Sequence, residues 1–94
     1  MYAIANLDKT WCVQENVRLF ALVDEFAEHM KAKLAVKVCQ GFAGWDDPAW
    51  RDEIVKNLVA HADGVDKADD GQFVDIANLA MFAWGQCMQA GGQA

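Results

Sequence analysis

Apolar side chains recur at helical spacing in three separate stretches of the chain. In the first stretch the apolar positions are Leu19, Leu22, Val23, Phe26, Met30 and Leu34. Steps of three and four residues place such side chains on one face of an α-helix. The pattern predicts a long first helix from about residue 16, or from nearer Thr10, to about residue 39, with Gly41 and Gly44 ending it.

The loop after this helix carries the signal for the start of a second helix. Asp47 can accept hydrogen bonds from the free amides of a first turn, and the fixed backbone of Pro48 fits the position after such a cap. Trp50, Ile54 and further apolar residues then follow on one face. We therefore predict a second helix over about residues 48–63.

The third stretch is apolar almost all round and yet carries a polar stripe. It is predicted to form a helix over about residues 71–89, with Asp70 as its N-cap. On a helical wheel its polar residues fall within a sector of about 120°. They are Gln72, Asp75, Asn78, Gln86 and Gln89. A helix without a polar, solvent-exposed face is normally buried, and a buried carboxylate needs a partner or a metal ion. We therefore expect Asp75 to be buried with such a partner, and the polar stripe to be the functional surface.

These elements indicate one all-α domain over residues 1–94, a small bundle of three main helices. Hydrophobic residues make up 54% of the 94 residues and include four Trp and five Phe. So short a chain has too little interior to hide this much apolar surface. We therefore expect a homo-oligomer, in the simplest case a dimer, to complete the bundle.

Charge and cysteine content narrow the functional classes. The formal net charge is −6, which argues against a protein that binds nucleic acid directly by neutralising phosphates. No apolar run approaches the ~20 residues of a membrane span, so no membrane partner is expected. Cys12, Cys39 and Cys87 lack the CxxC spacing of metal sites and are expected to be small core residues. The pattern is typical of a soluble protein of the reducing cytoplasm.

An acidic cluster on the first helix could hold a metal ion. Asp24, Glu25 and Glu28 lie at positions i, i+1 and i+4, so two of them stack on one face with the third beside them. Clustered carboxylates repel unless a cation lies between them, and Mg²⁺ prefers oxygen ligands. If they faced Asp75 and Asn78 of the third helix, they would form such a site. The alternative is a solvated helix face whose acids pair with nearby lysines.

Several short landmarks resemble, in the same order, those of a bacteriophage and prophage family. The landmarks are Phe26–Leu34 (FAEHMKAKL), Gly41, Gly44–Pro48 (GWDDP), Leu58–His61 (LVAH) and Val74–Met81 (VDIANLAM). They are similar to the N-terminal region of dATP/dGTP diphosphohydrolase-like proteins, and the resemblance covers about two thirds of the chain.

The arrangement is also similar to that of the wider all-α nucleoside triphosphate pyrophosphatases of the MazG and dUTPase-like type, which hold Mg²⁺ with an EExxE helix and an ExxD helix. Asp24-Glu25-x-x-Glu28 matches the first motif with a conservative change, and Gln72-x-x-Asp75 matches the second with its Glu replaced. The resemblance implies metal ligands at Asp24, Glu25, Glu28 and Asp75, and a hydrogen bond from Asn78 to metal-bound water or nucleotide. Apart from the resemblance, Lys31, Lys33 and Lys37 could contact phosphates, or be lysines of a solvated helix face, and Lys31 is taken as the nucleotide contact. In this class a water activated by Mg²⁺ or Mn²⁺ attacks a purine deoxynucleoside triphosphate and releases pyrophosphate.

Two other functions stay open. The altered second motif and the small size favour a non-catalytic phage protein in the host cytoplasm, which would block a basic face of a host defence complex of the anti-CRISPR or anti-restriction type. Its binding surface would be Asp46, Asp47, Asp52, Glu53, Asp63, Asp66, Asp69 and Asp70. The third function is an oligomer that binds nucleotides without hydrolysing them.

Overall fold

The first element is α1 (Lys9–Cys39), one uninterrupted helix in a computed structural model that describes residues 9–92. It begins close to the earlier of its two predicted starts. After it, Gly41 adopts the left-handed conformation with φ 88°, and the Phe42 amide donates a hydrogen bond to the Lys37 carbonyl at 3.1 Å. Such a bond closes a helix on a left-handed glycine, so the predicted glycine stop is confirmed.

The second helix begins where the sequence predicted, although its first turn is tighter than an α-helix. Asp47 Oδ1 accepts a hydrogen bond from the Ala49 amide at 3.0 Å, and Pro48 occupies the first turn. That turn is a short 3-10 helix, η1 (Pro48–Trp50), from which α2 (Arg51–Asp63) continues. The predicted N-cap role of Asp47 is confirmed.

The third helix, α3 (Asp70–Gly92), starts slightly before its predicted first residue. Asp69 Oδ1 accepts a hydrogen bond from the Gly71 amide at 3.0 Å. Asp69 therefore caps this helix. The expectation that Asp70 is the cap is wrong, because Asp70 is already the first helical residue.

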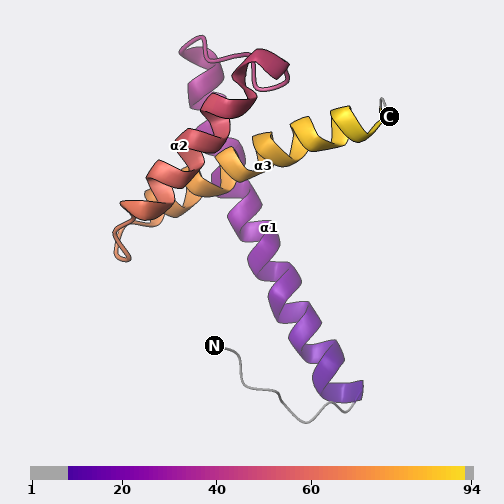
Figure 1. Cartoon of the computed structure of the whole chain (residues 1–94). Coiled ribbons are helices and arrows are strands. Elements are labelled where there is room, and N and C mark those ends of the chain that lie inside the picture. Colours follow the sequence, from indigo (N-terminus) through magenta and orange to yellow (C-terminus); the bar gives the residue numbers. More distant parts are fainter. Residues whose placement is uncertain (1–8, 93–94) are drawn as a thin grey trace.

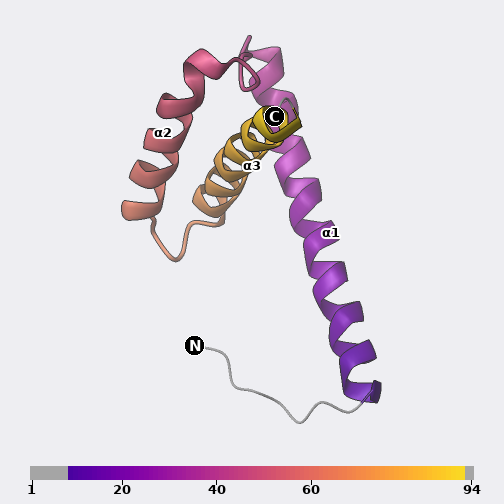
Figure 2. The same cartoon turned by 45° about the vertical axis from the view of Figure 1, so that its right-hand side comes forward.

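The three helices pack unevenly against one another. The second helix, α2, runs beside α3, and the C-terminal half of α1 crosses α3 (Figure 1). The N-terminal half of α1 projects away from both, as a second view confirms (Figure 2). Every regular element within residues 9–92 is helical, so the predicted all-α bundle of three helices is confirmed. In that part of the chain no helix combines the length and the apolarity that crossing a bilayer would require.

Polar side chains occupy much of the small interior. Among the described residues, Ile54 and Val74 are the buried hydrophobic ones, whereas Asn78 and Gln86 are the buried polar ones. On the other side of α3, the Trp84 side chain is 64% exposed. Within one chain, α3 is therefore not buried all round. Asn78 and Gln86 of its polar stripe face the rest of the chain, whereas Met81, Trp84 and Met88 on its apolar side are exposed.

The cysteines also differ from expectation. All three are free thiols; Cys39 and Cys87 are exposed, and Cys12 is half-buried. Their predicted place in the core is wrong within one chain, because α1, which carries Cys12 and Cys39, has no buried residue, and Cys87 is exposed on α3.

Candidate functional site

A groove of about 830 Å³ opens between α2, α3, the C-terminal half of α1 and the loop over residues 41–47. Aromatic rings of Phe42, Trp45, Trp50 and Phe82 line it together with aliphatic, polar and charged side chains. We call this hollow the aromatic groove. Its volume lies within the range of about 300–1,000 Å³ that is common for small-molecule sites.

The loop that forms one wall of the groove is fastened to α3. Gln86 Nε2 donates hydrogen bonds to the Trp45 carbonyl at 2.6 Å and to the Asp47 carbonyl at 3.0 Å. The Trp45 ring stacks on Phe82 with a centroid distance of 6.2 Å. It also lies so close to Gly85 that an added Cβ there would stand 2.7 Å from the Trp45 Cζ3 atom. The absence of a side chain at Gly85 thus makes room for the indole.

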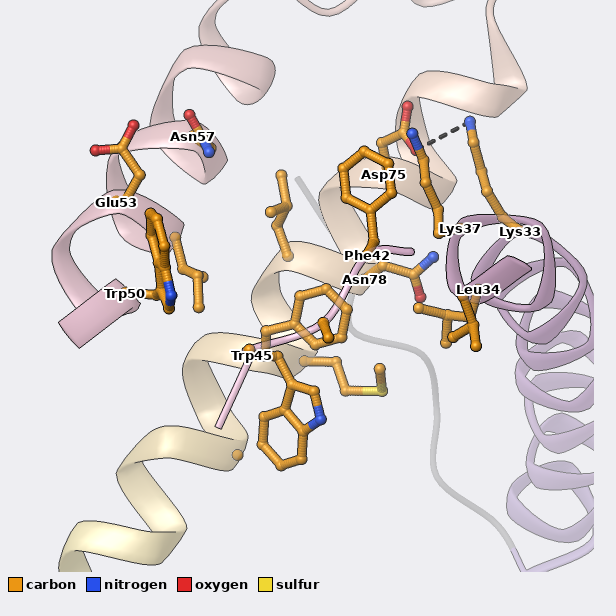
Figure 3. A pocket seen from close by; sticks show the side chains of 18 of the residues that line it. Lys33, Leu34, Lys37, Phe42, Trp45, Trp50, Glu53, Asn57, Asp75 and Asn78 are labelled. Carbon is orange, nitrogen blue, oxygen red and sulfur yellow. Dashed lines mark ion pairs between the residues drawn. The ribbon is translucent and has the colours of Figure 1, made fainter. Parts of the chain in front are cut away.

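Two lysines bring positive charge to the α1 side of the groove (Figure 3). Lys33 Nζ lies 2.9 Å from Asp75 Oδ1 and donates a hydrogen bond to the Gly71 carbonyl at 3.3 Å. Lys37 Nζ lies 4.7 Å from the centre of the Phe42 ring, in a cation–π contact. The expectation that Asp75 has a partner on the first helix is therefore met by Lys33, although both side chains are only half-buried.

The most unusual group in the groove is the side-chain amide of Asn78. Asn78 is 6% exposed, and it reaches from α3 toward Leu34 of α1 (Figure 3). Its Oδ1 atom is buried and has no hydrogen-bond partner among the described residues. A buried acceptor without a donor costs about 1–3 kcal/mol of folding free energy. A donor from a bound molecule would remove that cost, and because the atom is closed to solvent here, neighbouring side chains would have to move apart to admit that donor.

Lys31, the predicted nucleotide contact on the first helix, lies outside the groove. Its Nζ atom pairs with Glu28 Oε1 at 3.2 Å, and both side chains are largely exposed. Lys33 and Lys37 line the groove instead. The reason is helical geometry, because positions 33 and 37 lie one turn apart on a single face, whereas position 31 points elsewhere.

The four predicted metal ligands do not come together within one chain. Asp24, Glu25 and Glu28 are exposed on α1, and Asp75 is held by Lys33. Within residues 9–92, no three His, Cys, Asp or Glu side chains converge as a metal site requires. In this arrangement the residues do not fit a Mg²⁺ or Mn²⁺ ion.

The acidic residues proposed as a partner-binding surface are all exposed. They are Asp46, Asp47, Asp52, Glu53, Asp63, Asp66, Asp69 and Asp70. Three of them also hold local structure, because the side chains of Asp47, Asp66 and Asp69 accept hydrogen bonds from backbone amides two residues further on. The other five leave more freedom for substitution.

Sequence reasoning did not place the loop over residues 41–47 in the site, and it included Gln86 without identifying its partners. The glycine spacing of the loop was visible, since Gly44 adopts a φ of 99° and allows the turn before Trp45. Gln86 carried a weaker signal, as one member of the polar stripe. Its two carbonyl partners could be found only from the packing of the loop on α3.

Comparison with known proteins gives no match to a protein-family model, to a curated protein or to a solved structure. The function is therefore argued from the aromatic groove and the charges around it.

Proposed function

We propose that the aromatic groove binds a purine nucleotide and that the chain is a nucleotide-binding protein. The observation that carries this proposal is the buried, unpaired Oδ1 atom of Asn78 in the wall of the groove. An amide oxygen in such a position accepts a hydrogen bond from an N–H donor, and purine bases offer exocyclic amines or ring N–H groups of this kind.

The aromatic walls favour a flat ligand. Trp45 and Phe82 already stack on each other, and their rings together with Phe42 offer apolar faces to the groove. Stacking of a base on an aromatic side chain contributes about 1–3 kcal/mol. A base that stacks here would also cover part of Trp50, which is 53% exposed.

The lysines favour an anionic tail on that ligand. Lys37 contacts only the face of a ring in the interactions described above, so its ammonium group can turn toward a phosphate. Lys33 is tied to Asp75, and it keeps that carboxylate from repelling a phosphate. A nucleoside triphosphate would stack its base on the aromatic side chains and direct its phosphates toward the lysines of α1.

Binding of dATP and dGTP tests this proposal most directly. We expect the wild-type chain to bind both by calorimetry, and Lys37→Met to weaken binding about tenfold because one charge-assisted contact is lost. The matched control is Lys31→Met, which removes a lysine of the same helix outside the groove and should leave affinity unchanged. Absence of purine binding, or equal loss in both variants, would contradict the proposal.

Hydrolysis is a separate question that the same samples can answer. The resemblance to pyrophosphohydrolases implies a metal ion held by Asp24, Glu25, Glu28 and Asp75. For such an ion to bind, Lys33 would have to release Asp75, and acids from elsewhere would have to approach it. Incubation with each dNTP and Mg²⁺ or Mn²⁺, followed by detection of monophosphate and pyrophosphate, distinguishes a binding protein from an enzyme.

A second candidate function rests on the exposed acidic surface around α2. Its eight carboxylates could dock on a basic protein, for which electrostatic attraction raises the association rate. We expect the double variant Asp46→Lys and Asp63→Lys to keep the fold, since neither side chain is among the caps described above. It should lose capture of a basic host protein at low salt, while nucleotide binding stays intact. Equal capture by the double variant and the wild type would argue against this function.

A further inference from the structure

The apolar stripe of α1 continues beyond the part that α3 covers. Phe26, Met30 and Leu34 are half-buried where α1 crosses α3. One and two turns toward the N-terminus, Val23 and Leu19 continue the same face, yet they are 62% and 48% exposed. The stripe therefore has a covered half and an open half.

A second apolar row widens the open half. Val13, Val17 and Phe20 follow one another at helical spacing beside the stripe, and all three are exposed. No helix within the described residues lies against this half of α1 (Figures 1 and 2). Valine, leucine and phenylalanine in such a row are typical of a helix–helix interface.

The chain exposes more surface than a compact monomer of its size. Its accessible surface is 7674 Å², whereas a compact monomer of its mass exposes about 5,400 Å². The difference, summed over the whole molecule, is about 2,300 Å², and each partner in a standard interface buries roughly 800 Å². A standard interface would therefore need only part of this excess.

We propose that the N-terminal half of α1 packs antiparallel against the same half of α1 in a second copy of the chain. A parallel pair is excluded by packing, because the second α1 would have to occupy the side of residues 26–37 where α3 already lies. In an antiparallel pair the second helix instead runs past the N-terminal end of α1, away from α3.

The stripe also indicates a register. Cys12 and Asn16 extend the face of the stripe toward the N-terminus. If the two-fold axis passes between residues 17 and 18, Cys12 faces Val23 of the other copy and Asn16 faces Leu19, so the same face of each helix meets the other. The aromatic groove lies at the opposite end of α1 and stays open. This inference is therefore independent of nucleotide binding.

Analytical ultracentrifugation tests the interface. We expect a species of about twice the 10.4 kDa chain mass at micromolar concentration. Val23→Glu should weaken the dimer at least about 100-fold, because a charge would be buried between apolar side chains. Val36→Glu is the matched control: Val36 is also exposed on α1 but lies away from the stripe, and this variant should remain dimeric. A monomeric wild type, or dimers in both variants, would overturn the proposal.

Disulfide formation tests the direction and register. In a Cys39→Ser and Cys87→Ser background, addition of Val23→Cys should allow oxidation to a covalent dimer through Cys12. Without Val23→Cys no such dimer should form, since the two Cys12 residues would lie about 16 Å apart along the helix axis, too far for a disulfide. Efficient linkage through Cys12 alone would show a parallel pair and refute the antiparallel one.

Discussion

Asn78→Leu is expected to stabilise the free protein and to weaken the proposed nucleotide binding. Leucine has a similar branched shape and fits the apolar surroundings, so the variant removes a buried acceptor that has no partner among the described residues. The expected gain is about 1–2 kcal/mol in the free energy of unfolding. Affinity for dATP and dGTP should fall about 30-fold, since the base loses its hydrogen-bond acceptor.

Chemical denaturation and calorimetry on the same variant measure both effects. Asn57→Leu is the control, because Asn57 also lines the groove but is exposed on α2 (Figure 3). It should change neither quantity by much. If Asn78→Leu instead destabilises the protein, the amide takes part in a structural hydrogen bond, and the argument for a ligand at this position fails.

Gln86→Ala is expected to lower the free energy of unfolding by about 2–3 kcal/mol, because two hydrogen bonds to the loop are lost together. The Gln86 side chain is 5% exposed and holds the carbonyls of Trp45 and Asp47. Without it, the loop over residues 41–47 loses its polar attachment to α3. Trp45 should then leave its place against Phe82, which a change in tryptophan fluorescence would report.

The control for this change lies one turn further along the same helix. Gln89 belongs to the same polar stripe in the sequence but is exposed. Its replacement by alanine should alter stability by less than about 0.5 kcal/mol. Equal effects of the two substitutions would show that helix propensity, and not the loop attachment, accounts for the loss.

Local signals in the sequence predicted the helices well. The glycine stop at Gly41, the cap at Asp47 and the apolar periodicity of α1 each depend on a few neighbouring residues. For the same reason the cap of α3 was misplaced by a single position, since Asp69 and Asp70 are both capable acceptors. Only the backbone geometry distinguishes them.

The face that α3 turns toward the rest of the chain could not be predicted from local signals. The third helix carries a polar face and an apolar face, and the usual rule turns the apolar one inward. Here Asn78 and Gln86 face inward and Trp84 faces outward, because Gln86 binds loop carbonyls and the indole of Trp45 needs the space beside Gly85. These partners lie about 40 residues away in the sequence, so no local pattern contains them.

The candidate site was predicted in part. The sequence placed Asp75 and Asn78 on one functional stripe, and both line the aromatic groove. Of the three lysines that could contact phosphates, Lys31 was taken as the nucleotide contact, but the face that α1 turns toward α3 carries Lys33 and Lys37. That face follows from the crossing of two helices, which a single chain sequence does not specify.

The unbroken length of α1 sets the distance between the two aromatic grooves of the proposed dimer. Its 31 residues form one rod, with the groove wall near one end and the open apolar half at the other. In the antiparallel pair described above, the two grooves would therefore sit at opposite tips of the assembly, about 50 Å apart at 1.5 Å per residue. One nucleotide could not bridge them, and each would fill without touching the other. A single molecule that bound both grooves at once would need two groove-binding groups about 50 Å apart.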